Sequence, residues 1–181
     1  MIKKRFTFIL VAIAAILTFS SCEEKVTYTS SLFCDFVSTT DRNGYFESSN
    51  WYKFKDLTNI GNSRDVTDIE FLGTTITFEG VSYGDLMQGD VIKDVYIDVD
   101  GLYPFLYARN IAILRDDERI SFTTRDDPEF DAFMWDVINQ FRRNREVYIT
   151  VSAWITNQNS GVRNARMRVT LDNMLDVTVW E

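Results

Sequence analysis

Hydrophobic and polar residues alternate along most of the chain after residue 25, and this period of two predicts β-strands. The clearest case is Glu146–Thr156, in which every second residue is aliphatic. The same pattern predicts further strands at Val26–Val37, Trp51–Leu57, Asp65–Gly73, Thr75–Glu79, Val91–Asp100, Phe105–Leu114 and Arg119–Thr124.

Turn-forming residues between these segments predict how they are connected. We expect one hairpin that turns near Gly73 and another across the charged stretch Arg115–Glu118. Thr39–Asn50 is polar and contains the turn signal Asn43-Gly44, so we expect it to be a connection rather than a strand.

One segment, Pro128–Arg143, has the period of an amphipathic α-helix. Asp126 or Asp127 can cap its start, and proline suits the first helical position. Its apolar residues recur at the helical spacing, at Phe130, Phe133, Met134, Val137, Ile138 and Phe141.

The C-terminal segment keeps its alternation through Asp172-Asn173. A two-residue hairpin there would turn Val177 and Val179 to the solvent side, which sheet register resists. We therefore expect Val162–Trp180 to be one long, bulged strand, with a three-residue turn as the alternative. Together these elements predict a single domain, residues 26–181, that is mainly β. We expect an antiparallel β-sandwich or curled sheet with one amphipathic helix at about 128–143.

The first 22 residues have the layout of an export signal. Lys3, Lys4 and Arg5 precede the apolar run Phe6–Phe19, which ends in Ser-Ser-Cys. The apolar run is short for a membrane span, which needs about 20 residues.

The Ser-Ser-Cys ending at Cys22 resembles the lipobox of bacterial lipoproteins, and Glu23-Glu24-Lys25 is similar to the export tags of Bacteroidota surface lipoproteins. The resemblance covers residues 1–25. It implies that residues 1–21 are a signal peptide and that Cys22 becomes lipidated. Residues 22–25 would then be a short tether to the outer membrane. The domain could lie on the inner face or on the cell-surface face of that membrane.

Charge and composition narrow the possible functions. The chain has a net charge of −8, and loss of residues 1–21 would leave 16 basic against 27 acidic residues, or −11. Such an acidic protein is a poor partner for nucleic acid. The chain has no histidine, which excludes Ser-His-Asp and Cys-His catalysis and histidine-ligated zinc. Cys34, the only other cysteine, is expected to be a small buried apolar residue.

Aromatic and arginine residues on the non-core parity of the last two strands form the candidate binding site. They are Tyr148, Trp154, Arg166, Arg168 and Trp180, and they would share one sheet face if these two strands pair. Trp, Tyr and Arg dominate binding hot spots, and aromatic rings stack on sugars. The alternative is that these rings pack beneath the helix or a loop. Weaker candidates of the same kind are Trp51, Tyr52, Tyr103 and Tyr107.

Asp98 and Asp100 are the best candidates for a catalytic carboxylate pair, although a solvated strand end that runs into a turn explains them better. The segment from Tyr96 fails as a calcium loop, because tyrosines occupy its first and twelfth positions (Tyr96 and Tyr107). We therefore expect no metal and no cofactor.

These observations predict a non-enzymatic outer-membrane lipoprotein, an envelope accessory or binding module for a protein complex or a glycan. The alternatives are a carboxylate-dependent glycan hydrolase and a structural envelope or adhesin subunit.

Overall fold

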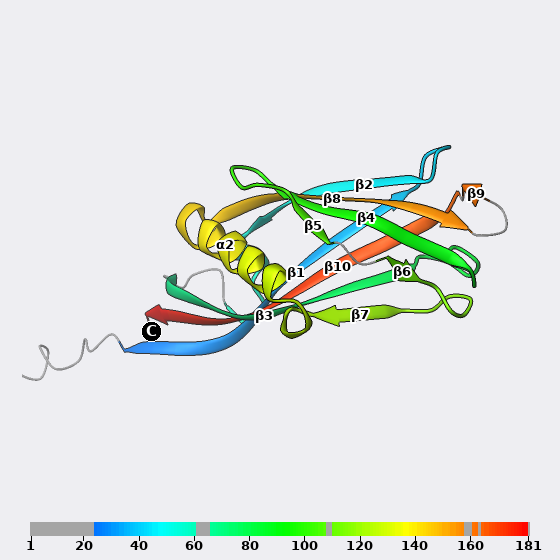
Figure 1. The fold of residues 1–181 in the computed structure, drawn as a ribbon. Coiled ribbons are helices and arrows are strands. Elements are labelled where there is room, and N and C mark those ends of the chain that lie inside the picture. Colours follow the sequence, from blue (N-terminus) through cyan, green and yellow to red (C-terminus); the bar gives the residue numbers. More distant parts are fainter. Residues whose placement is uncertain (1–23, 61–65, 108–109, 158–160, 163, 181) are drawn as a thin grey trace, which may run out of the picture.

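The protein is a sandwich of two antiparallel β-sheets with one α-helix, as seen in a computed structural model (Figure 1). The structure describes residues 24–60, 66–107, 110–157, 161–162 and 164–180. Its strands are β1 (Lys25–Thr39), β2 (Tyr45–Lys53), β3 (Val66–Gly80), β4 (Asp90–Val99), β5 (Phe105–Tyr107), β6 (Ile111–Ala112), β7 (Ile120–Thr123), β8 (Glu146–Asn157), β9 (Gly161–Val162) and β10 (Arg166–Trp180). The helix is α2 (Pro128–Asn144). The predicted fold class is confirmed.

The first sheet, sheet A, has the strand order β1-β10-β3-β7. Its central strand is β10, and every odd-numbered residue from Met167 to Val179 is buried. Asp172 and Asn173 lie inside this strand, so the predicted continuous strand is confirmed and the three-residue turn is wrong. The strand begins at Arg166, however, and Val162 belongs to the short strand β9.

The predicted hairpin near Gly73 is wrong, because β3 runs straight through this glycine as one strand. Met174 of β10 lies opposite Gly73, and Leu175 lies opposite Phe71, so Leu72 is an extra residue that forms a bulge. Gly73 has a φ of +153°, which favours glycine, and this explains why the residue looked like a turn.

The second sheet, sheet B, has the order β2-β8-β4-β5, with β6 also on β4 and β9 on β8. The prediction that Phe105–Leu114 pairs with Arg119–Thr124 is wrong. β5 and β6 both pair with β4 in sheet B, whereas β7 pairs with β3 in sheet A. The chain therefore crosses between the sheets at the charged turn, and strand alternation alone does not reveal which partner a short strand selects.

The segment predicted to be a polar connection also contains a strand. Asp41 Oδ1 accepts hydrogen bonds from the backbone N–H groups of Asn43 and Tyr45, both at 2.8 Å, and this tight turn ends early enough for β2 to begin at Tyr45. The polar residues that follow face solvent, while Phe46 is fully buried. The predicted strand Trp51–Leu57 overlaps only the end of β2, because a 3-10 turn begins at Phe54.

The helix fills the opening between the sheets at one end of the sandwich and contacts both β3 and β8. Asp127 caps it, since its side chain accepts hydrogen bonds from the backbone N–H groups of Glu129 and Phe130. Phe105 of β5 stacks on the helix residues Phe130 and Phe133, with ring centroids 5.6 and 5.1 Å apart. The apolar stripe thus joins the common core, as its spacing predicts.

Candidate functional site

The five predicted binding residues do not share one face. Tyr148 and Trp154 lie on β8 in sheet B, whereas Arg166, Arg168 and Trp180 lie on β10 in sheet A. The predicted pairing of these two strands is wrong, because β8 lies between β2 and β4 while β10 lies between β1 and β3. The structure divides the candidate site into an aromatic part and an arginine part.

On the outer face of sheet B, the two aromatic residues of β8 each meet an aromatic residue of β2. Trp154 lies against Tyr45, with ring centroids 4.9 Å apart, and Tyr148 lies against Trp51 at 5.0 Å. Each contact joins directly opposite residues in the ladder. Trp51 keeps 51% of its surface exposed. We call these four residues the paired aromatics.

Small polar side chains separate the paired aromatics along the ladder. Ser49 and Thr150 share a hydrogen bond of 2.9 Å between their hydroxyl oxygens. Tyr45 donates its hydroxyl to Glu47 Oε2 at 2.6 Å, and this hydrogen bond to the carboxylate raises the pKa of Tyr45. The two pairs lie six residues apart on β8, which is about 20 Å at roughly 3.4 Å per residue.

The neighbouring strand β4 extends this outer face. Lys93 lies opposite Trp154, Tyr96 lies opposite Ser152, and Asp98 lies opposite Thr150. The face therefore has aromatic surface at both ends and hydrogen-bonding groups between them. Such a face can hold an extended, polar chain whose rings or side chains stack on the paired aromatics.

Sequence reasoning found Tyr148, Trp154 and Trp51 but missed Tyr45. Tyr45 lies just beyond the turn in a segment that looked like a polar connection. The missed signal was the alternation of Tyr45, Glu47, Ser49 and Trp51 around the buried Phe46.

Other aromatic candidates have structural roles or isolated positions. Tyr52 is buried and donates its hydroxyl to the backbone carbonyl of Asp35 at 2.9 Å. Tyr107 is buried between Phe122 and Phe130. Tyr103 is 94% exposed in the connection after β4.

The arginine part of the predicted site belongs to an ion-pair row across sheet A. Arg168 Nε lies 3.2 Å from Asp35 Oδ1, without hydrogen-bond alignment, and its Nη1 lies 3.5 Å from Glu79 Oε1. Glu79 also pairs with Arg119 at 3.6 Å. Arg168 is thus already neutralised by its own sheet.

The two remaining predicted residues lie at opposite ends of β10. Arg166 is exposed, and its backbone N–H donates to Asp85 Oδ1 at 3.1 Å. Trp180 has Lys25 Nζ 4.9 Å from its ring centre, which joins the first residue of β1 to the last residue of β10.

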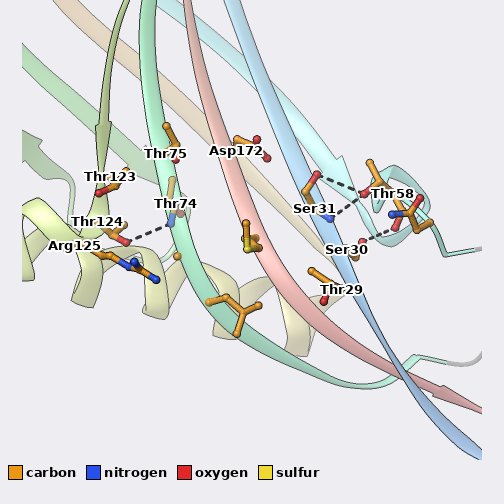
Figure 2. A pocket seen from close by; sticks show the side chains of 14 residues that line it. Thr29, Ser30, Ser31, Thr58, Thr74, Thr75, Thr123, Thr124, Arg125 and Asp172 are labelled. Carbon is orange, nitrogen blue, oxygen red and sulfur yellow. Dashed lines mark hydrogen bonds between the residues drawn. The ribbon is translucent and has the colours of Figure 1, made fainter.

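A groove of about 670 Å³ lies on the outer face of sheet A, and sequence reasoning did not identify it. Figure 2 shows Thr58 and the β1 hydroxyls Ser30 and Ser31 on one side and Thr123–Arg125 on the other. The wall at Thr58 is fixed, because Thr58 Oγ1 accepts the backbone N–H of Ser31 at 2.9 Å. Strands β3 and β10 form the floor with Leu72, Gly73, Met174 and Asp172.

The proposed carboxylate pair does not form a cleft. Asp98 lies on the outer face of β4, and Asp100 follows the strand, where its backbone carbonyl accepts a hydrogen bond from Gln140. Within the described ranges, no group of three or more acidic or cysteine side chains is arranged to hold a metal ion. Among the residues that the structure describes, no helix is long and apolar enough to cross a membrane.

Comparisons with known proteins give only distant structural similarity. No family model and no curated protein matches this chain. Among solved structures, the chain is similar to a decameric BFDV capsid protein at 10% identity and a TM-score of 0.43, covering 87% of this chain and 100% of that one. It is also similar to a structure of infectious bursal disease virus, Gx strain, at 9% identity and a TM-score of 0.27, covering 82% of this chain and 36% of that one.

Proposed function

We propose that this protein is a non-enzymatic outer-membrane lipoprotein whose sandwich domain binds a glycan through the outer face of sheet B. The observation that carries the glycan assignment is the set of paired aromatics, with Tyr45 against Trp154 and Trp51 against Tyr148. Lipidation of Cys22 would hold this face at the envelope.

The position of β1 supports a short tether. Cys22 itself lies outside the described residues, but the first strand begins at Lys25. Three extended residues reach about 10 Å, so the domain would sit close to the bilayer. Several acyl chains anchor firmly, since each buried CH₂ contributes about 0.8 kcal/mol.

The chemistry of the face favours a glycan over an apolar partner. The faces of pyranose rings carry C–H groups that pack on aromatic rings, while their hydroxyls need hydrogen-bonding partners. Sheet B supplies both, because hydroxyl and carboxylate side chains lie between the paired aromatics. A wholly apolar ligand would leave these groups without water or partners.

The charge of the face favours a neutral glycan. Glu47 and Asp98 lie between the paired aromatics, and both are exposed. Lys93 is the basic residue opposite Trp154. A polyanionic glycan would place its charges beside these carboxylates, where like charges repel.

The experiment titrates the full chain in detergent micelles with neutral glucan, mannan and chitin oligosaccharides and follows tryptophan fluorescence. A hexasaccharide of the preferred type should bind at least tenfold more tightly than its disaccharide, since only the longer chain reaches both aromatic pairs. Trp51→Ala and Trp154→Ala should each remove most of this gain. Trp135→Ala is the matched control, because Trp135 is 55% exposed on the helix and lies outside the face. Wild-type affinity in both face variants would contradict the assignment.

A further inference from the structure

The groove on sheet A contains two charged side chains of opposite sign. Arg125 lies at one wall and Asp172 lies on the floor (Figure 2). Neither side chain makes a hydrogen bond or ion pair with any residue that the structure describes, although most charged neighbours on this sheet are paired. Both groups are exposed and line the same groove.

Strand register sets how far apart the strands that carry these two charges lie. Asp172 lies opposite Thr75, and Thr75 lies opposite Thr123, two residues before Arg125. Two strand spacings amount to about 10 Å. A ligand that meets both charges therefore carries a cation and an anion and reaches across at least these two strand spacings.

Between the charges, the floor is apolar. Leu72 and Met174 retain 42% and 54% of their surface exposed, and Gly73, which lies opposite Met174, adds no side chain to the floor. Methionine adapts to differently shaped side chains. Hydroxyl groups of Ser31, Thr75 and Thr123 surround this floor and can donate or accept hydrogen bonds.

We infer that this groove binds a short peptide with free amino and carboxyl ends, of about three residues. An extended tripeptide spans about 10 Å, which is the separation of the strand positions Asp172 and Thr123. Its carboxylate pairs with Arg125 and its ammonium group pairs with Asp172. Its central side chain covers Leu72 and Met174, and its amides bond to the surrounding hydroxyls. The volume of about 670 Å³ lies within the range of small-ligand sites.

Termini-blocked peptides test this charge pairing directly. Calorimetry with the full chain in detergent micelles at pH 7 would compare Ala-Leu-Ala with its N-acetylated and C-amidated forms. Each blocked form should bind at least tenfold more weakly than the free peptide. Asp172→Asn should bind the free and acetylated forms equally, and Arg125→Gln should bind the free and amidated forms equally.

Matched variants separate site effects from general charge effects. Asp136→Asn and Arg143→Gln change exposed helix residues outside the groove, and both should keep the wild-type preference for free ends. Circular dichroism identifies any variant that fails to fold. If folded wild-type protein does not bind Ala-Leu-Ala, or binds blocked and free peptides equally, the inference is overturned. Because the groove lies on sheet A, a protein that binds glycans but no peptide would overturn this inference alone.

Discussion

Thr74 of β3 donates its hydroxyl to Asn173 Oδ1 of β10 at 2.6 Å, inside the hydrophobic core. The same amide donates through Nδ2 to the backbone carbonyl of Leu32 on β1 at 2.9 Å. One fully buried side chain thus connects three strands of sheet A. A shift of one residue in any ladder would leave these polar groups unpaired, so Asn173 helps to fix the register of the sheet.

Asn173→Leu should lower the free energy of unfolding by about 2 to 4 kcal/mol, because the buried Thr74 hydroxyl loses its acceptor and the Leu32 carbonyl loses its amide donor. Urea denaturation of the full chain in detergent measures this loss. Thr74→Val/Asn173→Leu should destabilise by less than the sum of the two single variants, since the valine removes the orphaned hydroxyl. Asn144→Leu, at the exposed end of the helix, is the control. Simple additivity of the two variants would show that the hydrogen bond contributes nothing.

Alkaline pH should destabilise the fold through Cys34 and Tyr52. Burial raises the pKa of the Cys34 thiol and of the Tyr52 hydroxyl well above their ordinary values. The unfolded chain loses these protons from about pH 8.5 for cysteine and pH 10 for tyrosine, while the folded protein keeps them. The stabilisation that comes from these two protonated groups is therefore fully present below about pH 8.5. It decreases as pH rises, by about 1.4 kcal/mol per pH unit for each group that is protonated in the folded protein and deprotonated in the unfolded chain.

The matched test measures urea unfolding between pH 8 and pH 11. Cys34→Ala and Tyr52→Phe should each flatten the decline, even though both lower stability at pH 7. Tyr83→Phe removes a tyrosine that is 93% exposed, and it should leave the wild-type slope unchanged. An equal decline in all four proteins would refute the assignment.

The helix cap gives a further prediction. Asp127→Ala should cost about 1 kcal/mol, because the backbone N–H groups of Glu129 and Phe130 lose their acceptor. Asp136→Ala, in the middle of the same helix on an exposed position, should change stability by less than about 0.5 kcal/mol. Thermal unfolding of both variants distinguishes the cap from a general loss of negative charge.

Cys22→Ala tests the anchor. Without the acylated cysteine, the protein should move from the membrane fraction to the soluble fraction of lysed cells. Mass spectrometry of the mature N-terminus should show acyl chains on wild-type Cys22. Cys34→Ala is the control, since this cysteine is buried in the core and its replacement should leave the protein in the membrane fraction. Unchanged membrane association of Cys22→Ala would remove the lipoprotein assignment.

Local patterns predicted the elements that depend on neighbouring residues. Alternation through Asp172-Asn173 correctly gave one strand, and the cap and stripe correctly placed the helix. The bulge at Gly73 imitated a turn, because both need the conformational freedom of glycine. Strand pairing was beyond reach, since nothing local distinguishes β2 from β10 as the neighbour of β8.

For the candidate site too, local patterns were predictable from the sequence and strand pairing was not. Outward-facing aromatics on β8 were recognisable from parity, so Tyr148 and Trp154 were correctly placed off the core. Their true neighbours, Trp51 and Tyr45, lie about a hundred residues earlier and meet them only through the fold. The groove on sheet A involves five separate segments, and its hydroxyl and apolar residues had no joint pattern in the sequence.

The position of β10 determines when the domain can be completed. Its ladder with β1 joins Lys25 to Trp180, and β10 also separates β1 from β3. Sheet A therefore cannot assemble until β10 is available, however early the other strands are made. A shortened chain that lacks β10 would leave the facing edges of β1 and β3 unpaired, and such bare strand edges are templates for aggregation.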